Sequence, residues 1–147
     1  MSIDKLKGTF STTMIAAAGL SASRLRADAC ASNIANEESV GYRRRDVFQT
    51  AISMPIGEGG FSAALDRQTL MKPSVYAILE DQAPPTMQYQ PNHPEANAEG
   101  YVAMPNVNMV EEMTNMMTAL RSYQANLTAM DAGREMAKES RTLLSQV

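Results

Sequence analysis

The sequence predicts an α+β fold: long N- and C-terminal helices packed antiparallel as a coiled-coil-like pair, with a small β-rich, proline-rich insert between them. All seven prolines lie between residues 41 and 105, so both ends lack the residue that breaks helices. Apolar side chains at both ends recur at spacings of three and four residues, which is the period of a helix face. We therefore divide the chain into an N-terminal helical segment (1–40), a β-rich or irregular middle (41–105) and a C-terminal helix (106–147).

The N-terminal segment carries a stripe of mostly small side chains. Alanine and serine let helix backbones approach closely but bury little apolar area, so this helix is expected to need a packing partner. It should end between residues 35 and 40, because asparagine tolerates a left-handed conformation and Gly41 can adopt a positive φ. The predicted packing positions are Ile15, Ala18, Ala22, Leu25, Ala29, Ser32, Asn33 and Asn36.

Two segments of the middle region resemble strands. Residues 47–52 and 75–79 are rich in β-branched and aromatic side chains, and the first ends near Pro55 and a glycine cluster. Four prolines then follow between residues 84 and 94. Since proline cannot donate a ladder hydrogen bond, we expect this stretch to be extended and mostly unpaired.

The C-terminal region has the strongest periodic pattern, and it predicts a helix of about 39 residues, or roughly 58 Å. Asn106 or Asn108 would cap its first turn, and Glu111 and Glu112 place negative charge near the positive end of the helix dipole. An intramolecular core and a seam between subunits both fit the pattern, although the length favours some contact between subunits. The predicted packing positions are Met109, Met113, Met116, Leu120, Tyr123, Leu127 and Met130.

The composition argues against an enzyme. Cys30 and His93 are the only residues of their types, so a Cys/His nucleophile pair is the one such arrangement available. Cys30 lies in an alanine-rich helix, where a small buried thiol is the default, and His93 lies in the proline-rich stretch. Metal ligands are scattered rather than clustered, so we expect no catalytic residue, no metal site and no cofactor.

The charge distribution argues against nucleic acid as a partner. The formal net charge is -3, and the only basic run is Arg43, Arg44 and Arg45, which is too short for a nucleic-acid patch. This run is either a solvated strand start or a group that pairs with acidic residues of neighbouring subunits. Glu111 and Glu112 are best interpreted as first-turn charges, because adjacent residues point away from each other on a helix.

No segment predicts a membrane span or a cleaved signal peptide. The longest apolar runs fall short of the roughly 20 residues that a membrane helix needs. Lys5 and Lys7 followed by the apolar residues 14–20 imitate a signal peptide, but polar residues dilute the approach to a short apolar segment. We therefore expect no cleaved signal peptide.

Motifs at both ends resemble the flagellar axial proteins, the rod and hook family of bacterial basal bodies. The N-terminal motif is Ser-Asn-Ile-Ala-Asn at 32–36, followed by Ser39 and Gly-Tyr-Arg-Arg at 41–44. The C-terminal motif comprises residues 105–108, 110–113 and 119–126. The segment from 81 to 102 and the short chain length narrow the resemblance to a proximal rod member, whereas residues 53–73 match nothing specific.

The resemblance implies a structural subunit that leaves the cytoplasm through the flagellar type III export apparatus without cleavage. It would polymerise helically in the periplasmic part of the basal body and form the drive shaft that transmits torque. The implied partners are copies of itself, other proximal and distal rod proteins, and basal-body components associated with the membrane ring and export gate. No direct membrane span is implied. Ser32, Asn33 and Asn36 would either bond laterally to neighbours or cap the helix end.

Two alternatives remain open from the sequence. Another rod subunit would share both terminal motifs and would differ in the neighbours that it touches. A helical adaptor or export chaperone would use the same amphipathic stripes but would lack the paired terminal motifs. Recovery of the chain in intact basal bodies distinguishes a rod subunit from a chaperone.

Overall fold

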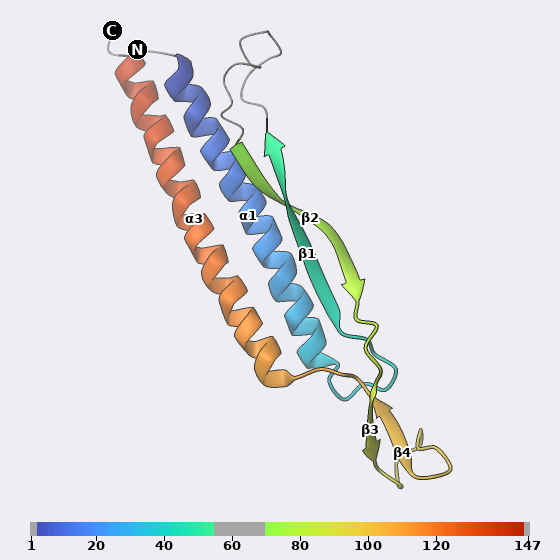
Figure 1. Cartoon of the computed structure of the whole chain (residues 1–147). Coiled ribbons are helices and arrows are strands. Elements are labelled where there is room, and N and C mark those ends of the chain that lie inside the picture. Colours follow the sequence, from blue (N-terminus) through green and yellow to red (C-terminus); the bar gives the residue numbers. More distant parts are fainter. Residues whose placement is uncertain (1–2, 55–69, 146–147) are drawn as a thin grey trace. The chain divides into compact units, whose positions relative to one another are not determined.

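The computed structural model describes residues 3–54 and 70–145, with side chains over 12–53 and 71–143. Its helices and strands bear out the coarse expectation of an α+β protein with a helix at each end (Figure 1). In chain order the elements are α1 (Ile3–Ala35), β1 (Arg45–Met54), β2 (Leu70–Glu80), β3 (Thr86–Tyr89), β4 (Tyr101–Met104) and α3 (Met109–Ser145).

Helix α1 ends where the sequence predicted. Its last residue is Ala35, and the next residue, Asn36, donates from Nδ2 to the carbonyl oxygen of Ser32 over 2.8 Å. This bond satisfies one of the carbonyl groups that a helix end leaves without a partner. Gly41 then adopts a φ of +78°, the left-handed conformation expected of it.

Strands β1 and β2 form a two-stranded sheet in which the arrows point in opposite directions (Figure 1). The predicted strand 47–52 lies within β1, and the predicted strand 75–79 lies within β2. Most of the stretch from residue 53 to 73 that matched no motif, namely 55–69, lies outside the described residues.

The expectation of an unpaired proline-rich stretch was wrong for Thr86–Tyr89. This segment is β3, and it pairs antiparallel with β4 in a register that places Thr86 opposite Met104 and Tyr89 opposite Tyr101. The two tyrosine rings meet edge to face with their centroids 5.3 Å apart. The prolines at 84, 85 and 91 flank β3 without entering it, so all four strand residues keep their N–H donors.

Helix α3 is 37 residues long and begins at Met109. Of the two predicted caps, Asn108 is the one used. Its Oδ1 accepts the backbone N–H groups of Val110 at 3.1 Å and Glu111 at 3.4 Å. These are donors that the first turn of a helix leaves without a partner, so the cap fixes where α3 starts.

The chain forms two compact units. One comprises Met1–Ser23, Gln49–Val75 and Arg121–Val147, and the other comprises Arg24–Phe48 and Tyr76–Leu120. In the first unit the helices approach so closely that a Cβ added at Gly19 would lie 2.6 Å from the Asn126 side chain, and one at Gly133 would lie 3.0 Å from Thr13 Cγ2. Glycine at these two positions is what permits the approach.

The buried apolar residues are small. In the described part of the chain they are Ala16, Ala22, Ala29, Cys30, Val102 and Ala119, while many larger apolar side chains are exposed. No helix in that part is long and apolar enough to cross a membrane. A core of this composition buries little apolar area, so polar contacts take a larger share in holding the elements together.

Candidate functional site

The most buried polar side chains of the described chain meet in the unit formed by residues 24–48 and 76–120. Glu112, in the first turn of α3, is 1 % exposed, and Asn33, near the end of α1, is 0 % exposed. Asn33 donates from Nδ2 to Oε2 of Glu112 over 3.0 Å, and Arg44 donates from Nε to Oε1 of the same carboxylate over 2.8 Å. We call Asn33, Arg44 and Glu112 the buried polar triad.

The amide of Asn33 also holds the chain segment that leads into β1. Its Nδ2 donates to the carbonyl oxygen of Arg45 at 2.9 Å, and its Oδ1 accepts the backbone N–H of Arg45 at 2.8 Å. The same oxygen accepts the hydroxyl of Tyr42 at 2.9 Å, and the Tyr42 and Ser32 hydroxyls lie 3.1 Å apart. Both donors and both lone pairs of this amide are therefore used, which removes the cost of burying it.

Arg44 is the cation of the triad and is held by several acids. Besides Glu112, its Nη1 lies 2.7 Å from Oδ2 of Asp46 and 3.9 Å from Oδ2 of Asp81. The backbone N–H of Asp81 donates to the carbonyl oxygen of Arg44 over 2.7 Å. The triad thus ties α3 to the end of α1, and Arg44 extends the connection to the start of β1 and the segment after β2.

The pKa values follow from this arrangement. Burial alone would raise the pKa of Glu112, but hydrogen bonds from Asn33 and Arg44, together with the charge of Arg44, hold it below its ordinary value of 4.5. Burial and the neighbouring Glu112 carboxylate raise the pKa of Cys30 from 9.0 to about 11. Glu112 is therefore charged and Cys30 is a neutral thiol at neutral pH, so Cys30 lacks the thiolate that a nucleophile needs.

The predicted stripe of α1 is largely removed from solvent. Ala22 and Ala29 are buried, as is Asn33, and the other predicted positions are half-buried: Ile15, Ala18, Leu25, Ser32 and Asn36. Ser32 and Asn33 bond to side chains distant along the sequence, whereas Asn36 bonds within one helical turn.

The predicted stripe of α3 divides into two rows. Met116, Tyr123 and Met130 are half-buried. The second row is between 39 and 49 % exposed, and we call it the exposed α3 row: Met109, Met113, Leu120 and Leu127.

The most buried positions of α3 form a third row, which alternates at spacings of four and three residues with the half-buried row. Glu112, Ala119 and Gly133 are buried and Asn126 is half-buried, with a constant spacing of seven residues. Hydrophobic periodicity did not find this third row, because its members are polar or small. The sequence does contain a pattern that indicates this row: small residues repeat every seven positions, and a small residue, Gly19, lies in the opposing helix.

The remaining predicted charge contacts are exposed. Arg43 donates from Nη1 to Oε1 of Gln82 at 3.1 Å, and the Arg45 guanidinium lies 5.8 Å from the centroid of the Tyr42 ring. Glu111 is exposed, in the first turn of α3, as expected of a first-turn charge. Of the five predicted positions, the structure brings only Arg44 and Glu112 together.

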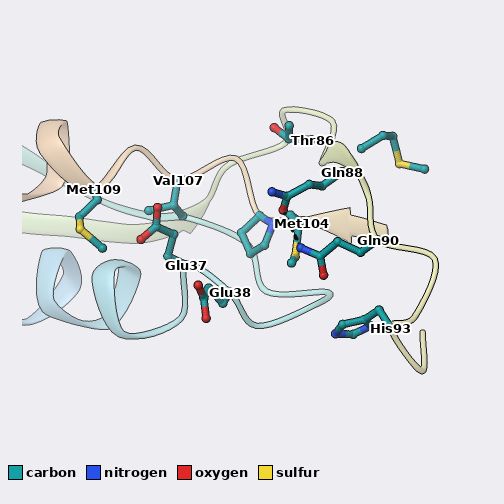
Figure 2. Close-up of a pocket in the computed structure, with 11 residues that line it drawn as sticks. Glu37, Glu38, Thr86, Gln88, Gln90, His93, Met104, Val107 and Met109 are labelled. Atoms are coloured by element: carbon teal, nitrogen blue, oxygen red, sulfur yellow. Dashed lines mark hydrogen bonds between the residues drawn. The ribbon is translucent and has the colours of Figure 1, made fainter. Parts of the chain in front are cut away.

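A groove of about 720 Å³ lies in the same unit, and Figure 2 shows the residues that line it. Glu37 and Glu38 line it from the turn after α1, and His93 lines it from the turn after β3. Nδ1 of His93 accepts the backbone N–H of Glu95 at 3.1 Å. Among the residues with described side chains, no three potential ligands from His, Cys, Asp and Glu are grouped closely enough to hold a metal ion.

Comparison with known proteins agrees with both terminal motifs. Residues 98–143 match the family model described as the C-terminal region of the flagellar basal body rod FlgEFG proteins. The flagellar basal-body rod protein FlgC of Borreliella burgdorferi is 36 % identical over 93 % of this chain and 98 % of its own length. The FlgC proteins of Salmonella typhimurium and Bacillus subtilis are 38 % and 34 % identical, over 88 % and 86 % of this chain and 92 % of each relative. The chain belongs to the family of flagellar basal-body rod proteins named FlgC.

Proposed function

We propose that this chain is a structural subunit of the proximal rod, which polymerises helically through its terminal helices into the drive shaft that transmits torque. Its full-length similarity to proteins named as basal-body rod proteins supports this role. The proposed location is the periplasmic rod, reached by export without cleavage. The proposed partners are further copies, other rod proteins and components near the membrane ring and export gate. Three observations argue for a structural role rather than an enzymatic one. The relatives are named as rod proteins, Cys30 is a buried neutral thiol, and the described side chains include no group of metal ligands.

The observation that carries the proposal is the exposed α3 row. Met109, Met113, Leu120 and Leu127 repeat with helical spacing and remain between 39 and 49 % exposed. A row of exposed apolar side chains on a long helix is typical of a surface that a partner covers. We infer that a neighbouring subunit covers this row. We also infer that the two helical segments, 1–40 and 106–147, make the contacts of assembly, and that the middle segment, 41–105, is attached to them as a separate β-rich part.

The proposal includes antiparallel packing of α1 and α3 as a coiled-coil-like pair. Two close contacts support it, because the contact of Thr13 is with Gly133 and that of Gly19 is with Asn126. The position on α3 therefore falls as the position on α1 rises. Small residues at such contacts allow the short distance between helix axes that a stiff two-helix element needs.

The test replaces Leu120 or Leu127 with Asp in the bacterium that encodes the chain. Both side chains are exposed in the subunit, so the variants should fold and accumulate, yet a charge on the seam should block rod assembly and abolish motility. Ala125→Asp is the matched control, because it places the same residue on an exposed position on the opposite side of α3 from the row. Swimming in soft agar and immunoblots of purified basal bodies are the measurements.

Normal basal bodies in the Leu120→Asp and Leu127→Asp strains would refute the seam. Recovery of the unmodified chain only in cytoplasmic complexes, and never in basal bodies, would instead favour an export chaperone. Fractionation of cells that express the unmodified chain distinguishes failure of the seam from failure of the proposed function.

A further inference from the structure

The groove in the unit formed by residues 24–48 and 76–120 has a strongly acidic side. Glu37 and Glu38 stand there together in the turn that follows α1, and Figure 2 shows both among the side chains around the hollow. The turn is held by its own backbone, since Glu37 N–H donates to the Ile34 carbonyl oxygen at 3.4 Å and Ser39 N–H donates to that of Asn36 at 3.1 Å. The two carboxylates are therefore presented from a defined position.

Neither carboxylate is paired with a cation among the described side chains. The ion pairs found among the described side chains are those of Arg24, Arg44 and Arg134, and none includes Glu37 or Glu38. The groove also has apolar walls, to which Met104 and Met109 contribute. Two adjacent acids beside apolar surface suit a ligand that combines positive charge with an apolar stem, as the arginine side chain does.

The same unit carries two arginines whose guanidinium groups have no acid partner among the described side chains. Arg43 bonds only to the neutral amide of Gln82, and Arg45 stacks over the ring of Tyr42. Both are exposed, whereas Arg44 between them is committed to the buried polar triad. Successive residues of an extended segment point to opposite sides, so the anchoring of Arg44 directs Arg43 and Arg45 outward together.

We propose that the groove receives Arg43 and Arg45 of a second copy of this chain, with their guanidinium groups paired to Glu37 and Glu38. This inference rests on the proposed function, because it requires copies to be neighbours in an assembly. Each copy carries both halves of the contact, an acidic groove and a basic pair. A head-to-tail contact between unlike surfaces generates an open helical array when its rotation does not close a ring.

Charge complementarity is the reason for choosing a second copy as the occupant. Arginine forms two parallel hydrogen bonds with a carboxylate, which sets orientation as well as attraction. The contact should therefore select the neighbour and its register more than it adds affinity, because charges at the rim of an interface chiefly govern specificity and encounter. A basic segment of a different rod protein is the competing occupant.

The test reverses the charges of the two glutamates and the two arginines in variants expressed by the bacterium that encodes the chain. One variant carries Glu37→Lys and Glu38→Lys, a second carries Arg43→Glu and Arg45→Glu, and a third carries all four changes. The control carries Glu95→Lys and Glu99→Lys, which reverse two exposed acids outside the groove. Immunoblots of purified basal bodies measure incorporation, and circular dichroism of the purified chains monitors folding.

Each double reversal should lower incorporation by at least about tenfold, because it places like charges opposite each other. The fourfold variant restores complementarity between copies and should recover incorporation to within about threefold of the unmodified chain. The control should match the unmodified chain. Failure of the fourfold variant to recover, or a harmless Glu37→Lys/Glu38→Lys pair, overturns the proposal. Absence of the unmodified chain from basal bodies would overturn the proposed function instead.

A second measurement does not depend on how the reversals fold. In a Cys30→Ala background, one copy carries Glu38→Cys and a co-expressed copy carries Arg43→Cys. Mild oxidation of purified basal bodies should link them into a disulfide-bonded dimer, whereas Glu95→Cys paired with Arg43→Cys should give none. Equal linking in the two pairs, or none in the first, contradicts the docking of a second copy.

Discussion

Asn33 and Glu112 lie 79 positions apart in the sequence and share a buried hydrogen bond of 3.0 Å. The bond joins the end of α1 to the first turn of α3, and Arg44 completes it by pairing with the same carboxylate. Burying a carboxylate is costly unless its lone pairs and its charge are both satisfied. Glu112 therefore specifies how these segments meet, and the buried apolar residues of the described chain are mostly alanine.

Glu112→Ala should destabilise the chain by about 3 kcal/mol, because it leaves the buried Asn33 amide and the half-buried Arg44 guanidinium without their common acceptor. Thermal or urea unfolding followed by circular dichroism measures the change. Glu111→Ala removes an equal charge from the neighbouring exposed position and should change the free energy of unfolding by less than about 0.5 kcal/mol. Similar losses in the two variants would mean that helix charge, and not the buried polar triad, is responsible.

Stability should fall in acid because of Glu112. Its pKa in the folded chain lies below the 4.5 of the unfolded chain, so the unfolded state binds more protons as pH falls. The contribution is complete above pH 4.5 and is lost as pH drops through the folded pKa. Urea unfolding between pH 3 and 7 should show a smaller acid loss in Glu112→Gln than in the unmodified chain. Parallel pH profiles for the two chains would rule out this linkage.

Cys30 should react slowly with alkylating reagents. A rise in pKa from 9.0 to about 11 lowers the thiolate fraction at pH 8 about 100-fold, and burial restricts access further. Mass spectrometry after treatment with iodoacetamide compares the native chain with the same chain in urea. Glu112→Gln removes a neighbouring negative charge and should speed the native reaction. A native rate close to that in urea would contradict the buried, neutral thiol.

Gly19→Ala should cost about 1 kcal/mol, because overpacking against Asn126 outweighs the better helix propensity of alanine. The double variant Gly19→Ala/Asn126→Ala makes room for the new Cβ and should recover most of that loss. Measuring the free energy of unfolding of both single variants and of the double variant completes a double-mutant cycle. Additive effects would show that the two residues do not meet.

Local patterns predicted much of the fold. The positions of the prolines predicted the limits of the middle region, and the helical spacing of apolar residues predicted α1 and α3. Both predictions succeeded because each pattern depends only on residues close together in the sequence. The pairing of β3 with β4 was missed, since a four-residue strand flanked by prolines has little periodicity. The buried polar triad was missed as well. Glu112 has a sufficient local explanation as a first-turn charge, so nothing nearby in the sequence indicates that Asn33 and Arg44 surround it.

The sequence by itself determined where the helices run, where α1 ends and which family the terminal motifs resemble, because these depend on neighbouring residues. Only the tertiary structure decided which row of residues on α3 is most buried. Helical spacing favoured the methionine and leucine stripe, but close approach is possible only where side chains are small, as at Ala119, Gly133 and Gly19. The row with small residues is therefore buried, and the larger side chains of the exposed α3 row are left outside.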